Sequence, residues 1–174
     1  MFNIKSLARM AICTALIVVC SWLTVPFTVP FTMQTFAIFF TVCLLGPWQG
    51  MISILVYILL GAVGVPVFAG FGSGPAVLFG KTGGYIIGYI LCAAIVGLLS
   101  RRLGFTFPKL CLSMVIGVAV CYVFGTAWFM VISGLNLATS LSYCVLPFLP
   151  GDAVKILLAA FLALRLRKPL QALS

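Results

Sequence analysis

Asp152 carries the only acidic side chain in this chain of 174 residues, and Lys155 follows it three positions later. Both lie in an apolar segment of a sequence that is 64% hydrophobic, 6% charged and free of histidine. An ionised side chain in hydrocarbon is strongly unfavourable unless it is paired or reaches water. At this spacing the two side chains project from the same face of a helix. We therefore expect Asp152 to accept hydrogen bonds from ligand N–H groups and Lys155 to donate to a ligand carbonyl or carboxylate.

A purely structural role is the alternative for this pair. Asp152 would then cap the first turn of a helix, where the helix dipole favours a carboxylate, and Lys155 would only neutralise it. That interpretation is the ordinary one in a soluble protein. In an apolar chain the pair is unfavourable because both charges lose their hydration, so we favour the ligand-binding role.

The composition defines the elements that must position this pair. A mean hydropathy of +1.35 and long apolar runs without strand-like alternation predict an all-α, polytopic membrane protein. The runs predict six transmembrane helices in a single domain that covers residues 1–174. Their approximate bounds are 6–23, 33–45, 48–63, 83–99, 110–132 and 150–166.

Basic residues decide between five and six crossings. They form three clusters at the ends of apolar runs: Lys5 and Arg9; Arg101, Arg102 and Lys109; Arg165, Arg167 and Lys168. Six crossings place all three clusters on one side, as the positive-inside rule requires, with both termini cytoplasmic. The irregular segments 26–32, 64–82 and 133–149 then lie on the outer face, near Asp152 and Lys155. Irregular backbone at membrane depth is tolerated around a cavity, so we expect a ligand pocket that opens outward.

Several classes of function conflict with this composition. The net charge of +9 is spread over helix ends, so the expected partner is membrane lipid and not nucleic acid. Gly80-Lys81-Thr82 lacks the earlier glycine of a phosphate-binding loop, and no second carboxylate is available for magnesium. Without histidine there is no Ser–His–Asp or Cys–His set, and a metal site would lack ligands. We expect no enzymatic activity, no metal and no cofactor.

A few other polar side chains are candidate ligand contacts. Gln34 and Thr35 open the second helix from the outer side, where each could bind a ligand or cap the helix. Tyr85 lies near the outer end of the fourth helix and could reach the pocket. Tyr89, one turn further along, is expected to pack against neighbouring helices or lie in an interfacial aromatic belt.

Two runs of small residues predict close helix contacts. Gly80, Gly84 and Gly88 recur at every fourth position, which is typical of a helix face that packs tightly. Ala11 and Ala15 form a similar step on the first helix. This step would either pack within the chain or form a flat docking face for a partner membrane protein.

Five motifs follow one another along the chain: Met33–Ala37 (MQTFA), Gly46-Pro47, Gly61–Gly70 (GAVGVPVFAG), Gly80–Tyr85 (GKTGGY) and Pro147–Asp152 (PFLPGD), the last followed by Lys155. In these motifs the chain resembles the BioY family, the substrate-binding S components of energy-coupling factor (ECF) transporters for biotin. The resemblance runs from about residue 8 to about residue 168. One departure is Lys81, where BioY chains often have proline; this extra cation at the outer rim could attract a carboxylate.

The resemblance implies a six-helix protein of the bacterial inner membrane that captures biotin from outside. It would dock, through the face of Ala11 and Ala15, on a transmembrane coupling subunit driven by two ATPase subunits. The expected ligand contacts are Asp152, Lys155, Tyr85, Gln34, Thr35, Phe68, Gly83 and Asn136. The alternatives are an S component for another vitamin, a stand-alone facilitator, and a structural membrane subunit without a ligand.

Overall fold

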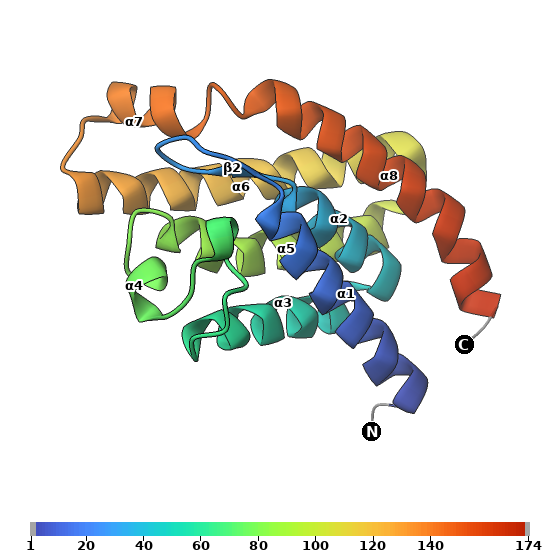
Figure 1. Cartoon of the computed structure of the whole chain (residues 1–174). Coiled ribbons are helices and arrows are strands. Elements are labelled where there is room, and N and C mark those ends of the chain that lie inside the picture. The colour runs from blue at the N-terminus through green and yellow to red at the C-terminus, as the bar shows by residue number, and fades with distance from the viewer. Residues whose placement is uncertain (1–2, 173–174) are drawn as a thin grey trace.

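The computed structural model describes residues 3–172, with side chains from residue 3 to residue 167. Six long helices match the six predicted apolar runs (Figure 1): α1 (Ile4–Trp22), α2 (Gln34–Leu45), α3 (Pro47–Ala62), α5 (Gly83–Leu103), α6 (Phe107–Ser133) and α8 (Leu149–Ala172). The predicted all-α architecture is confirmed. Five of the six helices extend past at least one predicted bound, and α5, α6 and α8 do so by three residues or more. α5 does so because Arg101 and Arg102 continue the helix, and cations favour the negative end of the helix dipole.

The six helices differ in how they fit a bilayer. Among the described residues, α1, α5 and α6 are each long and apolar enough to cross a membrane. α8 and the short helix before it form a fourth candidate span, bent by 47° at the break between them. α2 and α3 are apolar but have only 12 and 16 residues. They meet at Gly46, whose φ of 84° is a conformation that glycine adopts readily.

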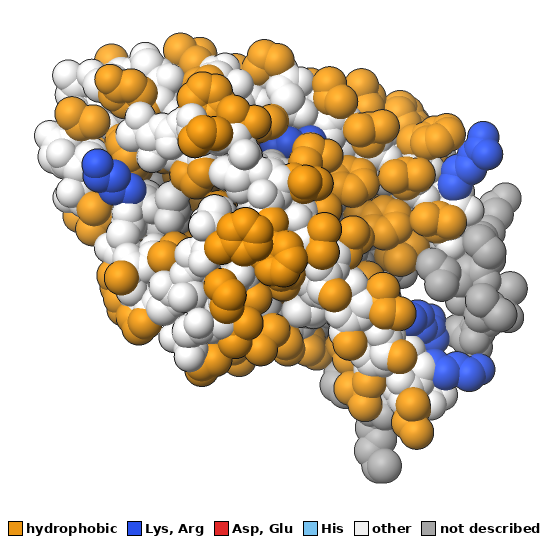
Figure 2. All heavy atoms as spheres, in the orientation of Figure 1, with side chains coloured by type: hydrophobic (Ala, Val, Ile, Leu, Met, Phe, Trp, Pro, Cys, Tyr) orange, Lys and Arg blue, Asp and Glu red, His pale blue; other side chains and the backbone are white. Residues whose placement is uncertain are grey.

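The two ends of the described chain lie at the same end of the bundle (Figure 1), as an even number of crossings requires. Figure 2 shows hydrophobic side chains spread over the face in view, with most of the lysine and arginine side chains gathered at that same end. Such a surface is typical of a protein solvated by lipid with one basic rim. The side chain of Lys168, which the topology prediction used, lies outside the described side chains.

The short elements lie at the opposite end of the bundle (Figure 1). The segment after α3 contains a 3-10 turn, η1 (Ala69–Phe71), and one helical turn, α4 (Pro75–Leu78), and is otherwise irregular as predicted. The other two segments are more regular than expected. β1 (Thr24–Val25) and β2 (Phe31–Thr32) pair as a small antiparallel hairpin. The predicted irregular segment 133–149 contains the helix α7 (Leu137–Cys144).

α5 and α6 pack closely along their length because glycines on each helix face bulky groups on the other. A Cβ atom on Gly84 would collide with Trp128, and one on Gly88 would press against Cys121. On α6, Gly117 faces the side chains of Val96 and Cys92 in the same way. The predicted packing role of the glycine repeat is confirmed for Gly84 and Gly88. Gly80 precedes the helix and lies against the backbone of α4.

Gly117→Leu is expected to destabilise the protein by about 1–3 kcal/mol, because the new side chain has no space between α5 and α6. The measurement is the thermal unfolding midpoint of the purified protein in detergent. Ala119→Leu is the matched control, since Ala119 lies two residues away on the same helix and is exposed. Equal midpoints for the two variants would contradict the packing described for α5 and α6.

Candidate ligand-binding site

The beginning of α8 positions the charged pair. Pro150 lies in the first turn of the helix, where a missing N–H is tolerated. Asp152 follows in the same turn, at the positive end of the helix dipole. Gly151 has a separate role: a Cβ atom there would collide with the ring of Phe31. The absence of that atom lets the β1–β2 hairpin reach the start of α8.

Asp152 and Lys155 form a buried ion pair, with 2.7 Å between Lys155 Nζ and Asp152 Oδ1. The two residues are 5% and 3% exposed. Thr35, near the start of α2, donates its hydroxyl to the same carboxylate oxygen at 3.2 Å. Tyr122 of α6 donates its hydroxyl to the other oxygen, Oδ2. Three helices therefore meet at one carboxylate.

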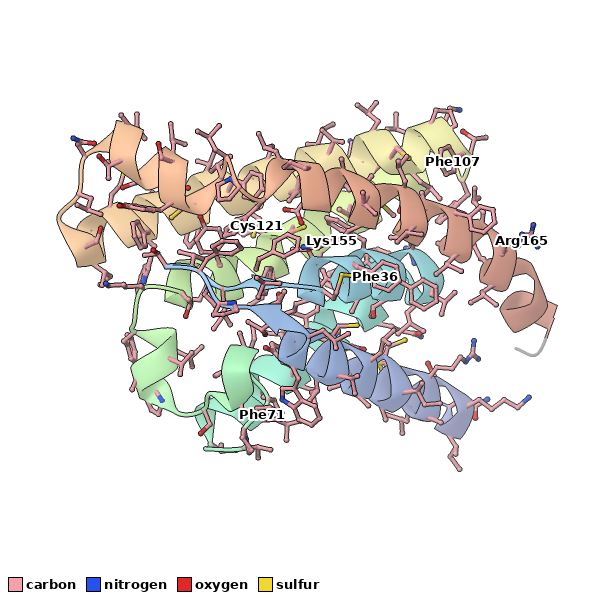
Figure 3. All side chains as sticks on the ribbon, turned by 45° about the horizontal axis from the view of Figure 1, so that its top comes forward. Phe36, Phe71, Phe107, Cys121, Lys155 and Arg165 are labelled. Atoms are coloured by element: carbon pink, nitrogen blue, oxygen red, sulfur yellow. The ribbon has the colours of Figure 1, made fainter. Side chains whose placement is uncertain are left out.

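The ammonium of Lys155 has a second neighbour. Its Nζ atom lies over the ring of Phe31, 3.6 Å from the centroid, and a desolvated cation in this position is attracted by the aromatic face. Phe31 in turn stacks on Phe148, with 5.7 Å between centroids. In Figure 3, Lys155 lies in the interior between α8 and α2, whereas Arg165 on the same helix points outward. The pair is thus held by an aromatic wall on the hairpin side.

This pair lines a cavity of about 420 Å³, a size that is ordinary for a small-molecule site. The predicted contacts Gln34, Thr35, Phe68 and Tyr85 line the same cavity. They come from α2, from the segment after α3 and from α5. The structure therefore brings together six of the eight residues named from the sequence, although their contact with a ligand stays a prediction.

Gly83 and Asn136 are not among the lining residues. Gly83 is buried against the carbonyl of Leu78, where its missing side chain allows α4 to pack on the start of α5. Asn136 is exposed and caps α7, accepting a hydrogen bond from the backbone N–H of Thr139 at 2.9 Å. The structure gives both residues a role in local folding and places neither at the cavity.

The hydroxyl of Tyr85 already has hydrogen-bond partners within the protein. It lies 3.2 Å from the hydroxyl of Thr126 and donates to the carbonyl of Cys144 at 3.3 Å. Tyr85 therefore presents its ring, and not a free donor, to the cavity. Tyr89, expected to pack among helices or lie in an aromatic belt, also lines the cavity.

Four aromatic residues of the site were missed by sequence reasoning: Phe31, Tyr57, Tyr122 and Phe148. A signal existed for the two tyrosines. A phenol in the middle of an apolar membrane helix needs a hydrogen-bond partner, which often belongs to a functional site. The two phenylalanines carried no such signal, because an apolar side chain in this chain is the norm.

The arrangement suits a small amphipathic ligand. Asp152 can accept N–H groups, Lys155 and Lys81 supply positive charge, and aromatic rings cover an apolar body. Within the part of the chain that the structure describes, no group of three or more His, Cys, Asp or Glu side chains is placed to hold a metal ion. Fold and site together define a multi-pass membrane protein that binds a small molecule.

Comparison with known proteins identifies the family to which this membrane protein belongs. The chain belongs to the BioY family, whose sequence profile matches residues 1–172. It is 39% identical to the biotin transporter BioY of Thermotoga maritima, over 94% of this chain and 96% of the relative. It is 40% identical to the probable biotin transporter BioY of Pyrococcus horikoshii, over 80% of this chain and 81% of the relative.

A solved structure agrees with this membership. The crystal structure of the S-component for biotin from an ECF-type ABC transporter superposes with a TM-score of 0.90 at 30% identity, covering 97% of this chain and 95% of that chain. The match extends over all six long helices, because nearly the whole chain is aligned. The family and fold expected from the sequence motifs are both confirmed.

The small-residue step on α1 faces outward. Ala11 and Ala15 are exposed, and they line an apolar groove of about 540 Å³ between α1 and α3. Leu7, Val18 and Leu60 lie along the same groove. This exposure shows that the step is not buried by packing within the chain, and its role as a docking face stays a prediction.

Proposed function

We propose that this protein captures biotin from the outer side of the membrane and delivers it across as the S component of an ECF transporter. The observation that carries the proposal is the buried Asp152–Lys155 pair on the wall of a ligand-sized cavity, in a chain of the BioY family. Relatives of this chain carry the name biotin transporter. The family and its names are those of transporters and not of enzymes.

The chemistry of biotin matches the cavity. Its ureido ring has two N–H donors and a carbonyl, its bicyclic body is apolar, and its side chain ends in a carboxylate. Asp152 serves as the acceptor for a ureido N–H, and its charge is stabilised by Lys155 and the Thr35 hydroxyl. Phe31 and Phe68 cover the apolar body. A site of a few polar groups among aromatic walls is the usual form of a small-molecule pocket.

The carboxylate of biotin belongs at the mouth of the cavity. Lys81 and Thr82 line the cavity next to the first turn of α5, and Lys81 is exposed. A carboxylate near Lys81 keeps much of its hydration, whereas a carboxylate at the buried wall would lose it. This places the ureido ring inward and the valerate chain outward.

The docking partner of the proposed S component is a transmembrane coupling subunit driven by two ATPase subunits. The apolar groove of Ala11 and Ala15 on α1 supports this assignment, because small residues allow a second helix to approach closely. With Lys5, Arg9, and the basic residues Arg101, Arg102 and Lys109 between α5 and α6 at the cytoplasmic side, the cavity end faces outward. We place the protein in the bacterial inner membrane as one domain over residues 1–174.

Biotin is expected to raise the thermal unfolding midpoint of the purified protein. A ligand present at a thousandfold excess over its dissociation constant stabilises the folded state by about 4 kcal/mol. Riboflavin, thiamine and a buffer blank form the comparison panel. A midpoint raised by another vitamin would indicate a different S component, and no shift with any vitamin would favour a structural subunit. Uptake of biotin by cells that lack every coupling subunit would instead favour a stand-alone facilitator.

A further inference from the structure

Two guanidinium groups come together at the basic end of the bundle, far along the chain from each other. Arg101 lies against the turn between α2 and α3, where its Nη2 atom is 3.0 Å from the point that a Cβ atom of Gly46 would occupy. Arg167 lies over the ring of Phe105, with 3.1 Å between its central carbon and the ring centroid. Phe105 follows Arg101 by four residues. The two cations are close enough to repel each other, and Arg167 also interacts with Cys43 near the end of α2.

Neither cation has a counter-ion in the described part of the chain. The single acidic side chain, Asp152, forms an ion pair with Lys155 near the beginning of α8, whereas Arg167 lies towards the end of that helix. No described residue accepts a hydrogen bond from the guanidinium of Arg101 or of Arg167. The negative ends of α2 and α5 offset part of the repulsion, but ten N–H donors, five on each group, are left for another acceptor. This combination points to a bound anion.

Local packing holds both groups in position for such an anion. The ring of Phe105 covers one face of the Arg167 guanidinium, which restricts its plane and leaves its N–H edges free. Gly46 has no side chain to displace Arg101, and its φ of 84° is a conformation that favours glycine. Planar guanidinium groups bind phosphate oxygens through two parallel hydrogen bonds. Two of them at one place therefore suit a phosphate group.

The surroundings favour a phosphate carried by a lipid over a soluble one. Figure 2 shows the basic side chains at this end beside a hydrophobic surface. Trp48, two residues after Gly46, is exposed, as are Leu103 and Phe107 on either side of the turn between α5 and α6. An exposed tryptophan at the end of a membrane helix is typical of the headgroup level. Exposed apolar side chains at this level contact acyl chains, which a soluble phosphate lacks.

We propose that Arg101 and Arg167 form a binding site for the phosphate group of an anionic phospholipid. The positive-inside rule places this end of the bundle at the cytoplasmic leaflet, whose anionic headgroups attract basic segments. One bound phosphate would relieve the repulsion between the two cations and link the ends of α5 and α8. The inference does not depend on which ligand the cavity binds.

The test measures the thermal unfolding midpoint of the purified protein in detergent with added lipid. Dimyristoylphosphatidylglycerol is the anionic probe. Dimyristoylphosphatidylcholine, with the same acyl chains and phosphate but no net charge, and inorganic phosphate are the comparisons. We expect phosphatidylglycerol to raise the midpoint of the wild type by several degrees more than phosphatidylcholine does, because a ligand of the folded state stabilises it. Arg101→Gln and Arg167→Gln should each lose most of this difference, and inorganic phosphate should have little effect.

Arg165→Gln is the matched control. It removes the same charge two residues from Arg167, but the Arg165 guanidinium points outward over the ring of Phe161 (Figure 3), so this variant should keep the full effect of phosphatidylglycerol. Native mass spectrometry counts the phosphatidylglycerol molecules retained by each variant, and should find fewer on Arg101→Gln and Arg167→Gln than on Arg165→Gln.

Three results would overturn the inference. Equal losses in all three variants would show a general attraction to the basic rim and no defined site. Equal stabilisation by inorganic phosphate would assign the two arginines to a soluble anion. Equal stabilisation of the wild type by both lipids would remove the role of charge, and would leave these arginines for an acidic segment of a partner subunit.

Discussion

Asp152→Asn is expected to weaken biotin binding by roughly a hundredfold or more, which corresponds to about 3 kcal/mol. The carboxylate accepts hydrogen bonds at both oxygens, from Lys155 and Thr35 on one and from Tyr122 on the other. An amide replaces one of these acceptors by an NH₂ group and removes the negative charge, so the site has one acceptor fewer for a ligand N–H and Lys155 loses its counter-ion. Calorimetry with purified protein in detergent measures the change in affinity.

A control separates lost binding from lost folding. Asn136→Ala removes the exposed cap of α7, away from the cavity, and should leave the affinity for biotin unchanged. Unfolding midpoints of both variants without ligand show whether each is folded. An Asp152→Asn protein that binds biotin as tightly as the wild type would remove Asp152 from the site.

Lys155→Met is expected to destabilise the unliganded protein by about 3–5 kcal/mol, because it leaves the buried charge of Asp152 without a counter-ion. Methionine matches the length of the lysine stem, so the change concerns mainly charge. The thermal unfolding midpoint measures the loss. Lys109→Met provides the comparison at an exposed lysine near the start of α6, where we expect little effect.

The double variant Asp152→Asn/Lys155→Met makes this prediction sharper. With both charges removed, the fold should regain much of the stability that Lys155→Met loses, since a neutral pair carries no uncompensated buried charge. Binding of biotin should not return, because the charged carboxylate that accepts its N–H groups is still missing. A double variant less stable than Lys155→Met would show that the pair contributes to folding beyond charge compensation.

The helices and the charged pair were predictable from the sequence for simple physical reasons. Six apolar runs bounded by basic clusters indicated six helices, and the structure has them at nearly those positions. A spacing of three residues places Asp152 and Lys155 on one helix face whatever the tertiary structure is. Only 6% of the residues are charged and a single one is acidic, so this pair could be identified as a candidate site without a structure.

The partners of the pair were not predictable, because they arise from packing between distant segments. Tyr122 lies 30 residues before Asp152, and only the approach of α6 to α8 brings them together. Phe31 reaches Lys155 through a hairpin too short to leave a pattern in the sequence. Periodicity within one helix contains no information about either contact.

Asn136 shows the opposite case, in which a local signal was available but was interpreted differently. Asparagine is among the most favoured residues at a helix N-cap, and Asn136 caps α7 in that way. Treating the whole of residues 133–149 as irregular hid the helix that follows. The motif around Gly83 was also assigned to the ligand, although the structure uses this glycine to pack α4 against α5.

The shortness of α2 has a consequence for the transport step. Twelve residues rise about 18 Å, against roughly 30 Å for the hydrocarbon of a bilayer. The last residue of α2 precedes Gly46, which lies against the guanidinium of Arg101 at the basic rim. Its first residue, Gln34, therefore sits well below the opposite membrane surface. Under the proposed function, a vitamin bound there would already have descended through part of the permeability barrier, and the coupling subunits would have only the remaining distance to open.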